Sequence, residues 1–144
     1  RWLLEELGKF NENLPLAADM DFVLRARARG YRPYFEPDAV GQHHAVHRSF
    51  EDILHYSHTH AATTIRLRLD RPDLTDTPSF FFRPYLLLLS APCVALAATA
   101  GIFLRSAGMA TLLHTAPVVY ILKAAWCVGA AGALLNESSN RTHS

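Results

Sequence analysis

The sequence predicts an α/β unit of helices and short strands, followed by a two-helix transmembrane hairpin. Over residues 1–70, helical patterns alternate with short β-prone segments that are bounded by Gly and Pro. Two long apolar segments then occupy residues 85–104 and 109–135. The proline-containing residues 71–84 read as a linker between the two parts, and the polar residues 136–144 form a tail.

Each apolar segment is long enough to cross a bilayer as a helix. The first has no charged side chain over about 20 residues, the length that about 30 Å of hydrocarbon requires. The second is interrupted only by His114 and Lys123, and residues 105–108 join the two segments in a tight turn. A lysine in the middle of a span costs about 2.5–3.5 kcal/mol on insertion scales. We therefore expect Lys123 to face a partner helix, a neighbouring subunit or a water-filled crevice.

Small residues in the hairpin recur at four-residue spacing, at Ala97 and Gly101 and at Ala125 and Gly129. This spacing permits close contact between membrane helices, although it also arises by chance in alanine-rich segments. The remaining composition excludes other classes. The net charge is +1 and no basic run is interleaved with aromatics, so no nucleic-acid partner is predicted.

The first 70 residues contain three helical patterns. Residues 2–7 form a short one, which Gly8 ends in a left-handed conformation. Residues 19–29 begin with acids and end with arginines before Gly30, as the helix macrodipole favours. A capping box at Ser49 opens a third helix, which runs to about Leu69. Between the second and third helices we expect two short strands, at residues 31–35 and 39–42, the first an edge strand because it contains a proline.

Two carboxylates at the start of the second helix are candidates for chemistry. Asp19 and Asp21 follow a proline-containing loop, where a carboxylate can act as a general base, a metal ligand or a helix cap. On chemistry alone, capping is the commoner role. Loops beside a rigid helix are nevertheless a usual place for an acid–base group.

Histidines gather after the second expected strand. Residues 43–47 read His-His-x-x-His, and Glu51, His55 and His58 share one face of the following helix. Imidazole binds divalent transition metals, so a metal site is one hypothesis. No His-Glu-x-x-His signature occurs, and for the group on the helix we favour the interpretation that its side chains are simply solvated.

Several of these motifs occur together in a recognisable order. Residues 1–68 resemble the C-terminal part of the catalytic domain of family 2 glycosyltransferases, which have the GT-A fold. The matching runs are Gly8-Lys9-Phe10-Asn11-Glu12, Ala18-Asp19-Met20-Asp21-Phe22-Val23-Leu24-Arg25, Gly30-Tyr31, Pro37-Asp38-Ala39 and His43-His44. Their order and spacing match together, which is more specific than any one motif.

The resemblance implies roles for individual residues. Asp19 would be the general base that deprotonates the acceptor hydroxyl. His43, or its neighbour His44, would approach a metal-bound diphosphate, and Asp21 and Arg25 would support the fold. The loop that borders the acceptor and the donor sugar would comprise Gly8, Phe10, Asn11 and Glu12.

The chain also departs from the family pattern. Ala18 replaces the glutamate beside the base, Lys9 replaces a glycine and Asn11 replaces an acid. The βαβ nucleotide-binding half of the family's domain, with the Asp-x-Asp metal motif that belongs to it, does not occur in these residues. We therefore expect the chain to be part of a longer enzyme and to be inactive alone.

The expected enzyme transfers a sugar from a nucleotide-diphosphate donor to a lipid-linked or envelope-glycan acceptor. The family's default is an inverting single displacement, assisted by a divalent ion such as Mg or Mn. The arginines nearest the first span on its N-terminal side are Arg66, Arg68, Arg71 and Arg83, whereas the turn between the spans offers only Arg105. This bias predicts a multi-pass protein of the cell (inner) membrane with its catalytic part in the cytoplasm. Two alternatives remain: a non-catalytic membrane anchor or assembly subunit that retains part of the fold, and a membrane metal-binding protein.

Overall fold

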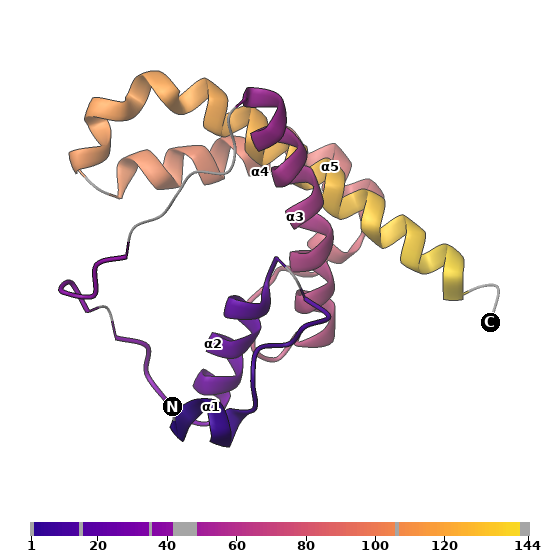
Figure 1. Ribbon diagram of the computed structural model, residues 1–144. Coiled ribbons are helices and arrows are strands. Elements are labelled where there is room, and N and C mark those ends of the chain that lie inside the picture. Colours follow the sequence, from indigo (N-terminus) through magenta and orange to yellow (C-terminus); the bar gives the residue numbers. More distant parts are fainter. Residues whose placement is uncertain (1, 15, 35, 42–48, 106, 142–144) are drawn as a thin grey trace.

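The computed structural model describes residues 2–14, 16–34, 36–41, 49–105 and 107–141. Of the described residues, 75% are helical (Figure 1). The α-helices and 3₁₀ helices are α1 (Trp2–Leu7), α2 (Ala18–Ala28), α3 (Phe50–Asp70), η1 (Ser79–Phe82), α4 (Pro84–Leu104), η2 (Ala107–Thr115) and α5 (Ala116–Arg141).

The expected α/β class is wrong, because the described residues contain no strand and no sheet. The two segments expected as strands are exposed coil and turn over residues 31–34 and 36–41. Val40 and Tyr34 are 89% and 83% exposed. A β-strand is stable only when it is hydrogen-bonded to a neighbouring strand, and no described segment pairs with either of these two. Pro33 and Pro37 also lack the backbone N–H that such pairing needs. The GT-A architecture expected from the resemblance is therefore not the fold of this chain.

The ends of the first helices confirm their local signals. Gly8 and Gly30 end α1 and α2 with φ angles of 80° and 86°, the left-handed region that glycine favours. At the start of α3, the Asp52 amide donates to Ser49 Oγ at 3.0 Å, and the Ser49 amide donates to Asp52 Oδ2 at 3.1 Å. Both halves of the predicted capping box are thus formed.

The two apolar segments form helices that fold back on each other (Figure 1). Two helical stretches, Pro84–Leu104 and Gly108–Ser139, are long and apolar enough to span a membrane. The second begins as the 3₁₀ helix η2 and becomes α-helical at Ala116. Pro117 lies at this change. Its nitrogen carries no hydrogen and cannot donate to a carbonyl of the preceding turn, so a proline is tolerated in the first turn of an α-helix.

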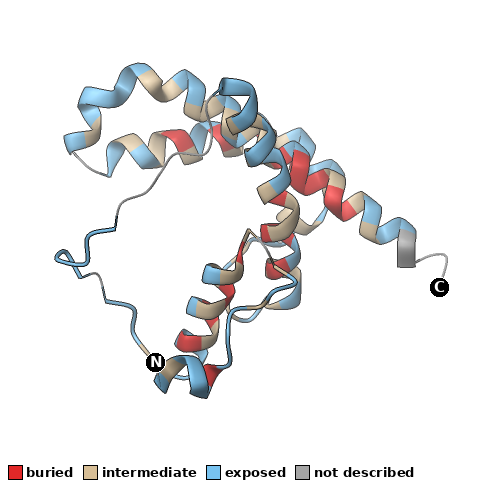
Figure 2. Ribbon diagram, viewed as in Figure 1, coloured by how far each residue is buried: buried red, intermediate tan, exposed pale blue. Residues whose placement is uncertain are grey.

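Helix α3 packs along α5 and completes a three-helix core with α4. At their crossing the helices approach so closely that a Cβ added to Gly129 would overlap the His58 carbonyl oxygen. Ser57 Oγ donates to the Leu122 carbonyl at 2.8 Å, and Arg66 pairs with Glu137 at 3.0 Å. Figure 2 shows a run of buried residues on α5. The buried residues of this cluster are Ala61, Ile65, Leu87, Ala91, Cys127, Ala130, Ala131, Ala133 and Leu134.

A smaller core attaches α2 to the far end of α3. Leu24 of α2 and Ala17 before it are buried against Leu67, near the end of α3. Partly buried apolar side chains from the loop before α2, from α2 itself and from the turn after α3 complete this core: Leu14, Met20 and Leu74. The position of α2 therefore depends on α3, which is itself held by α5.

The Gly129 crossing gives a stability prediction. Gly129→Ala places a methyl group against the rigid His58 backbone, so the helices must separate. We expect the free energy of unfolding in detergent to fall by about 1–3 kcal/mol, the usual cost of overpacking. Gly132→Ala is the matched control, since nothing lies within 4 Å of its added Cβ. Helix propensity should make that control more stable by up to about 1 kcal/mol. Equal effects of the two substitutions in denaturant titrations would contradict the close crossing.

Candidate functional site

Asp19 lies in the first turn of α2 with an exposed side chain. Its carboxylate does not cap the helix, because the N-cap residue is Ala17 and no side chain there accepts a capping bond. Asp19 Oδ1 instead accepts a hydrogen bond from the adjacent Met20 amide at 2.8 Å. The carboxylate therefore remains accessible at the protein surface.

An open pocket of about 390 Å³ adjoins Asp19. Its walls come from three places in the chain. Phe10 belongs to the loop after α1, Leu16 and Ala18 flank the start of α2, and Tyr56 belongs to α3. Two aromatic rings and one carboxylate thus share a concave surface, an arrangement suited to a ligand with both an apolar face and hydroxyl groups.

Asp21, only two residues after Asp19, has the opposite environment. It is 3% exposed, and its Oδ2 accepts a hydrogen bond from Arg25 Nε at 2.8 Å. The Arg71 guanidinium approaches its other oxygen at 4.0 Å. A buried carboxylate with these partners stabilises the local fold and is not available to a ligand. The two acids therefore differ in exposure and pairing.

Arg25 joins α2 to the loop that begins at Gly8. Beyond the Asp21 pair, its guanidinium donates to the carbonyls of Gly8 at 3.3 Å and of Lys9 at 2.9 Å, and also to that of Leu7. Only arginine among the side chains presents several donors in this fixed geometry. One side chain thus neutralises Asp21 and fixes the start of the loop.

Phe10 extends this connection from the loop to the pocket. Its ring lies 5.1 Å from the ring of Phe22 on α2, measured between centroids, and the Arg25 guanidinium lies 5.4 Å from the Phe22 ring. Phe10 also lines a second cavity of about 660 Å³. The other residues of that cavity come from α1 and the loop: Leu4, Glu5, Gly8, Lys9 and Glu12.

The structure brings together only some of the predicted site residues. Gly8, Phe10 and Glu12 line the larger cavity, and Phe10 and Asp19 line the smaller one. Asn11 instead accepts a hydrogen bond from the Asn13 amide at 3.1 Å, which shapes the turn of the loop. The predicted diphosphate contacts, His43 and His44, lie outside the described residues.

Contacts between Tyr31 and α1 hold that helix against the end of α2. The Tyr31 hydroxyl donates to Glu6 Oε2 at 2.8 Å, and its ring meets the edge of Trp2 at 5.7 Å between centroids. The hydrogen bond to Glu6 raises the pKa of Tyr31, because loss of the proton would break the bond and place two negative charges together. Arg29 adds a hydrogen bond to the Glu6 carbonyl at 2.8 Å.

The described residues do not form a metal centre. No group of three or more His, Cys, Asp or Glu side chains is arranged to hold an ion in the parts of the chain that the structure describes. Glu51, His55 and His58 on α3 are all exposed. The divalent ion stays a prediction for a complete enzyme.

Tyr56 and Arg71 are site residues that the sequence did not indicate. Tyr56 faces the Asp19 pocket only because α2 docks against α3, a contact between residues far apart in the chain. Arg71 reaches Asp21 for the same reason. The helical pattern of α3 places Tyr56 on its surface but contains no signal for which helix lies opposite.

Comparisons with known proteins give no relative, since no family model, no curated protein and no solved structure matches this chain. The resemblance to family 2 glycosyltransferases therefore stays a prediction that rests on the quoted motifs.

The Arg25 contacts predict an effect on the loop. Arg25→Gln leaves the Asp21 carboxylate buried beside a single distant cation and frees the loop carbonyls. We expect the free energy of unfolding to fall by about 2–3 kcal/mol. Amide hydrogen exchange over residues 8–12 should become faster. Arg27→Gln is the control, because Arg27 is exposed on the same helix. Unchanged exchange in the Arg25 variant would show that the loop is held by other contacts.

Proposed function

We propose that this chain is the acceptor-binding and membrane-associated part of a glycosyltransferase, with Asp19 as the general base. The proposal does not depend on the α/β fold that the described chain lacks. It depends on one observation: Asp19 is exposed in a pocket with Phe10 and Tyr56, whereas Asp21 is buried and paired with Arg25. Environment thus divides the two acids into one that is available for proton transfer and one that supports the fold.

The pocket suits a sugar or lipid-linked hydroxyl acceptor. The rings of Phe10 and Tyr56 offer faces on which the apolar side of a sugar can pack, and Asp19 offers an acceptor for its hydroxyl proton. In the proposed step the hydroxyl oxygen attacks the anomeric carbon of the donor. The bond from that carbon to the diphosphate breaks, and the hydroxyl proton passes to Asp19. The donor is a nucleotide-diphosphate sugar, and its site lies outside the residues described here.

A non-catalytic anchor or assembly subunit is the second candidate. It is favoured by Ala18, which stands where the family pattern has a glutamate beside the base and which lines the Asp19 pocket. A small apolar residue there removes a hydrogen-bonding group from the acceptor site. The two candidates differ in whether the Asp19 carboxylate matters.

Substitution of Asp19 tests the enzymatic proposal. In the complete enzyme, Asp19→Asn should lower the rate of transfer by about 10²–10⁴-fold, the usual contribution of a positioned base. Donor binding measured by calorimetry should stay nearly unchanged. Asp38→Asn, at an exposed carboxylate outside the pocket, is the control. If the Asp19 variant keeps most of its turnover, the residue has no part in the chemistry and the anchor candidate gains.

The exposed apolar surface supports membrane association. Leu89 on α4 and Leu104 at its end are 80% and 85% exposed, and α4 carries no charged residue. A helix that is apolar on all sides is stable when lipid or protein covers these side chains and removes them from water. By contrast α3, which covers one face of α5, exposes charged and histidine side chains. We propose that α4, η2 and the first part of α5 face lipid, while α3 lies on the side of α5 that faces water or protein.

The proposed topology places both ends of the hairpin in the cytoplasm of a multi-pass inner-membrane protein. Arg66, Arg68, Arg71 and Arg83 precede the first span, whereas the turn between the spans contains only Arg105. Reporter fusions after Gly108 and after Ser144 test this placement. We expect a periplasmic signal from the first fusion and a cytoplasmic signal from the second. The reverse result at either position would overturn the topology.

A further inference from the structure

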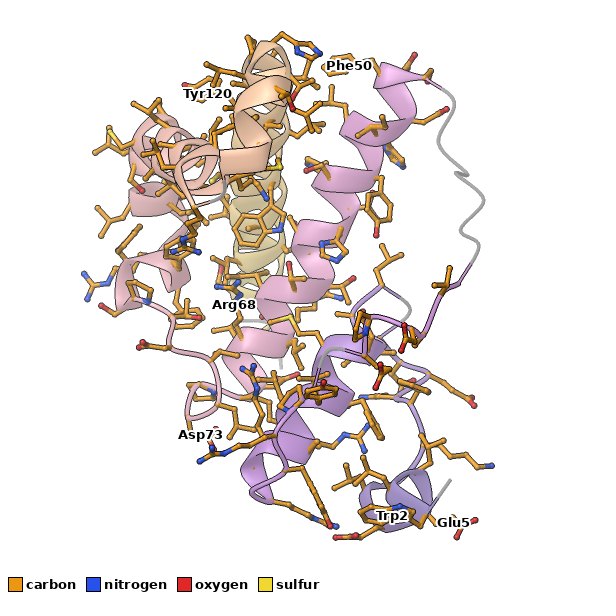
Figure 3. The ribbon with its side chains drawn as sticks, turned by 90° about the vertical axis from the view of Figure 1, so that its left-hand side faces the viewer. Trp2, Glu5, Phe50, Arg68, Asp73 and Tyr120 are labelled. Carbon is orange, nitrogen blue, oxygen red and sulfur yellow. The ribbon has the colours of Figure 1, made fainter. Side chains whose placement is uncertain are left out.

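A cavity of about 310 Å³ lies where α3, α4, α5 and η1 meet. Three basic side chains line it: His60 and Arg68 from α3 and Lys123 from α5. The Trp126 ring and Val94 form apolar parts of the wall. Figure 3 shows Arg68 on the side of α3 that faces α4 and α5.

The basic side chains of this cavity have no acidic partner. Within the described parts of the chain, no ion pair joins His60, Arg68 or Lys123 to a carboxylate. The positive charges of Arg68 and Lys123, which share one cavity without a counter-charge, repel each other and attract an anion.

Arg68 is the most informative of the three. Its Nε is buried and has no hydrogen-bond partner, and burial lowers the pKa of the guanidinium. The rest of the group has neutral contacts only: NH1 donates to Thr77 Oγ1 at 3.2 Å, and the Trp126 ring centroid lies 5.8 Å from Cζ. A partly buried guanidinium with a free N–H is costly unless an anion accepts from it. Planar arginine donors match the oxygens of a phosphate group.

Lys123 extends the cavity toward the turn of the hairpin. A second cavity of about 410 Å³ shares Lys123 and Ala98 with the first. Its other walls are mainly the small and apolar face of α4, at Ala97, Gly101 and Ile102, with Arg105 at its end. The two cavities thus adjoin at Lys123 and Ala98, and we call the pair the basic groove, which has basic groups and an apolar wall. A lysine in an apolar segment is expensive, and in such segments it marks a binding or transport path.

We propose that this groove binds a phosphate group, which is presented by an anionic membrane lipid whose headgroup is drawn below the membrane surface by Lys123 in the middle of the second span. Arg68 and Lys123 contact the phosphate oxygens, His60 adds a donor at the rim, and the α4 wall receives the start of the lipid chain. The proposal goes beyond the proposed function, because binding here requires neither a sugar donor nor Asp19. Failure of one proposal therefore leaves the other standing.

Lipid binding to the purified chain in detergent tests the proposal. The probes are dioleoyl phosphatidic acid, dioleoylglycerol, which has the same chains but no phosphate, and inorganic phosphate as competitor. Native mass spectrometry measures the bound lipid. We expect phosphatidic acid to bind and dioleoylglycerol not to bind. Arg68→Gln and Lys123→Met should each weaken phosphatidic acid binding by about tenfold or more, the loss expected for one charge-assisted hydrogen bond. The controls Arg32→Gln and Arg83→Gln also remove a positive charge, but from exposed residues outside the groove, and should bind normally.

A second variant separates binding from folding. Ala98→Leu keeps every charge and narrows the groove where its two cavities join, so it should also weaken phosphatidic acid binding. Displacement of the lipid by inorganic phosphate at a comparable concentration would overturn the lipid as the ligand and identify the free anion instead. Equal binding of the two lipids, equal losses in the control variants, or unchanged binding in Ala98→Leu would overturn the proposal.

Discussion

The crossing of α3 over α5 at Gly129 is the constraint on which the other contacts depend. Because Gly129 lacks a side chain, the α3 backbone at His58 comes within van der Waals distance of α5. This approach lets Ser57 reach the Leu122 carbonyl and buries Ala61 and Ile65 against the small residues of α5. A polar helix is thereby held against an apolar one. The cavity that Arg68 and Lys123 share exists because the two helices meet there with α4.

The candidate acceptor site also depends on this crossing, because α2 packs on α3 and α3 packs on α5. Leu67 of α3 is the point at which α2 docks, and α2 presents Asp19 outward while it buries Asp21. Arg25 then transmits the position of α2 to the loop through three backbone carbonyls. The difference between the two acids follows from helix geometry, since residues two apart point to different sides of an α-helix. One side meets the docking surface and the other meets solvent.

Local signals in the sequence predicted local structure well. The capping box at Ser49, the left-handed Gly8 and Gly30 and the pair of apolar helices each depend on residues close together in the chain. The prediction of two strands was wrong because a strand forms only where a second strand pairs with it. Residues 31–34 and 36–41 have no such partner among the described segments. The four-residue spacing of Ala125 and Gly129 permits a close helix contact without predicting one, and nothing in the sequence shows that the partner of Gly129 is α3. The apolar positions of α3, among them Ile53, Leu54, Ala61 and Ile65, fall largely on one side of the helix. They indicate that this side is buried and not what buries it.

The Asp19 pocket and the basic groove are neighbours, and this connects the two proposals. Met20, which follows Asp19 on α2, lines the groove, while Asp19 lines the pocket. On α3, Tyr56 of the pocket stacks on His60 of the groove, with 5.5 Å between ring centroids. A molecule whose phosphate is held by Arg68 and Lys123 would therefore extend toward Asp19 past this aromatic pair. An acceptor that carries its hydroxyl group on a lipid phosphate has this combination of parts. The arrangement gives a physical reason for a polar pocket and an apolar hairpin to occur in one chain, since the helix contacts that place Asp19 also form the walls of the groove.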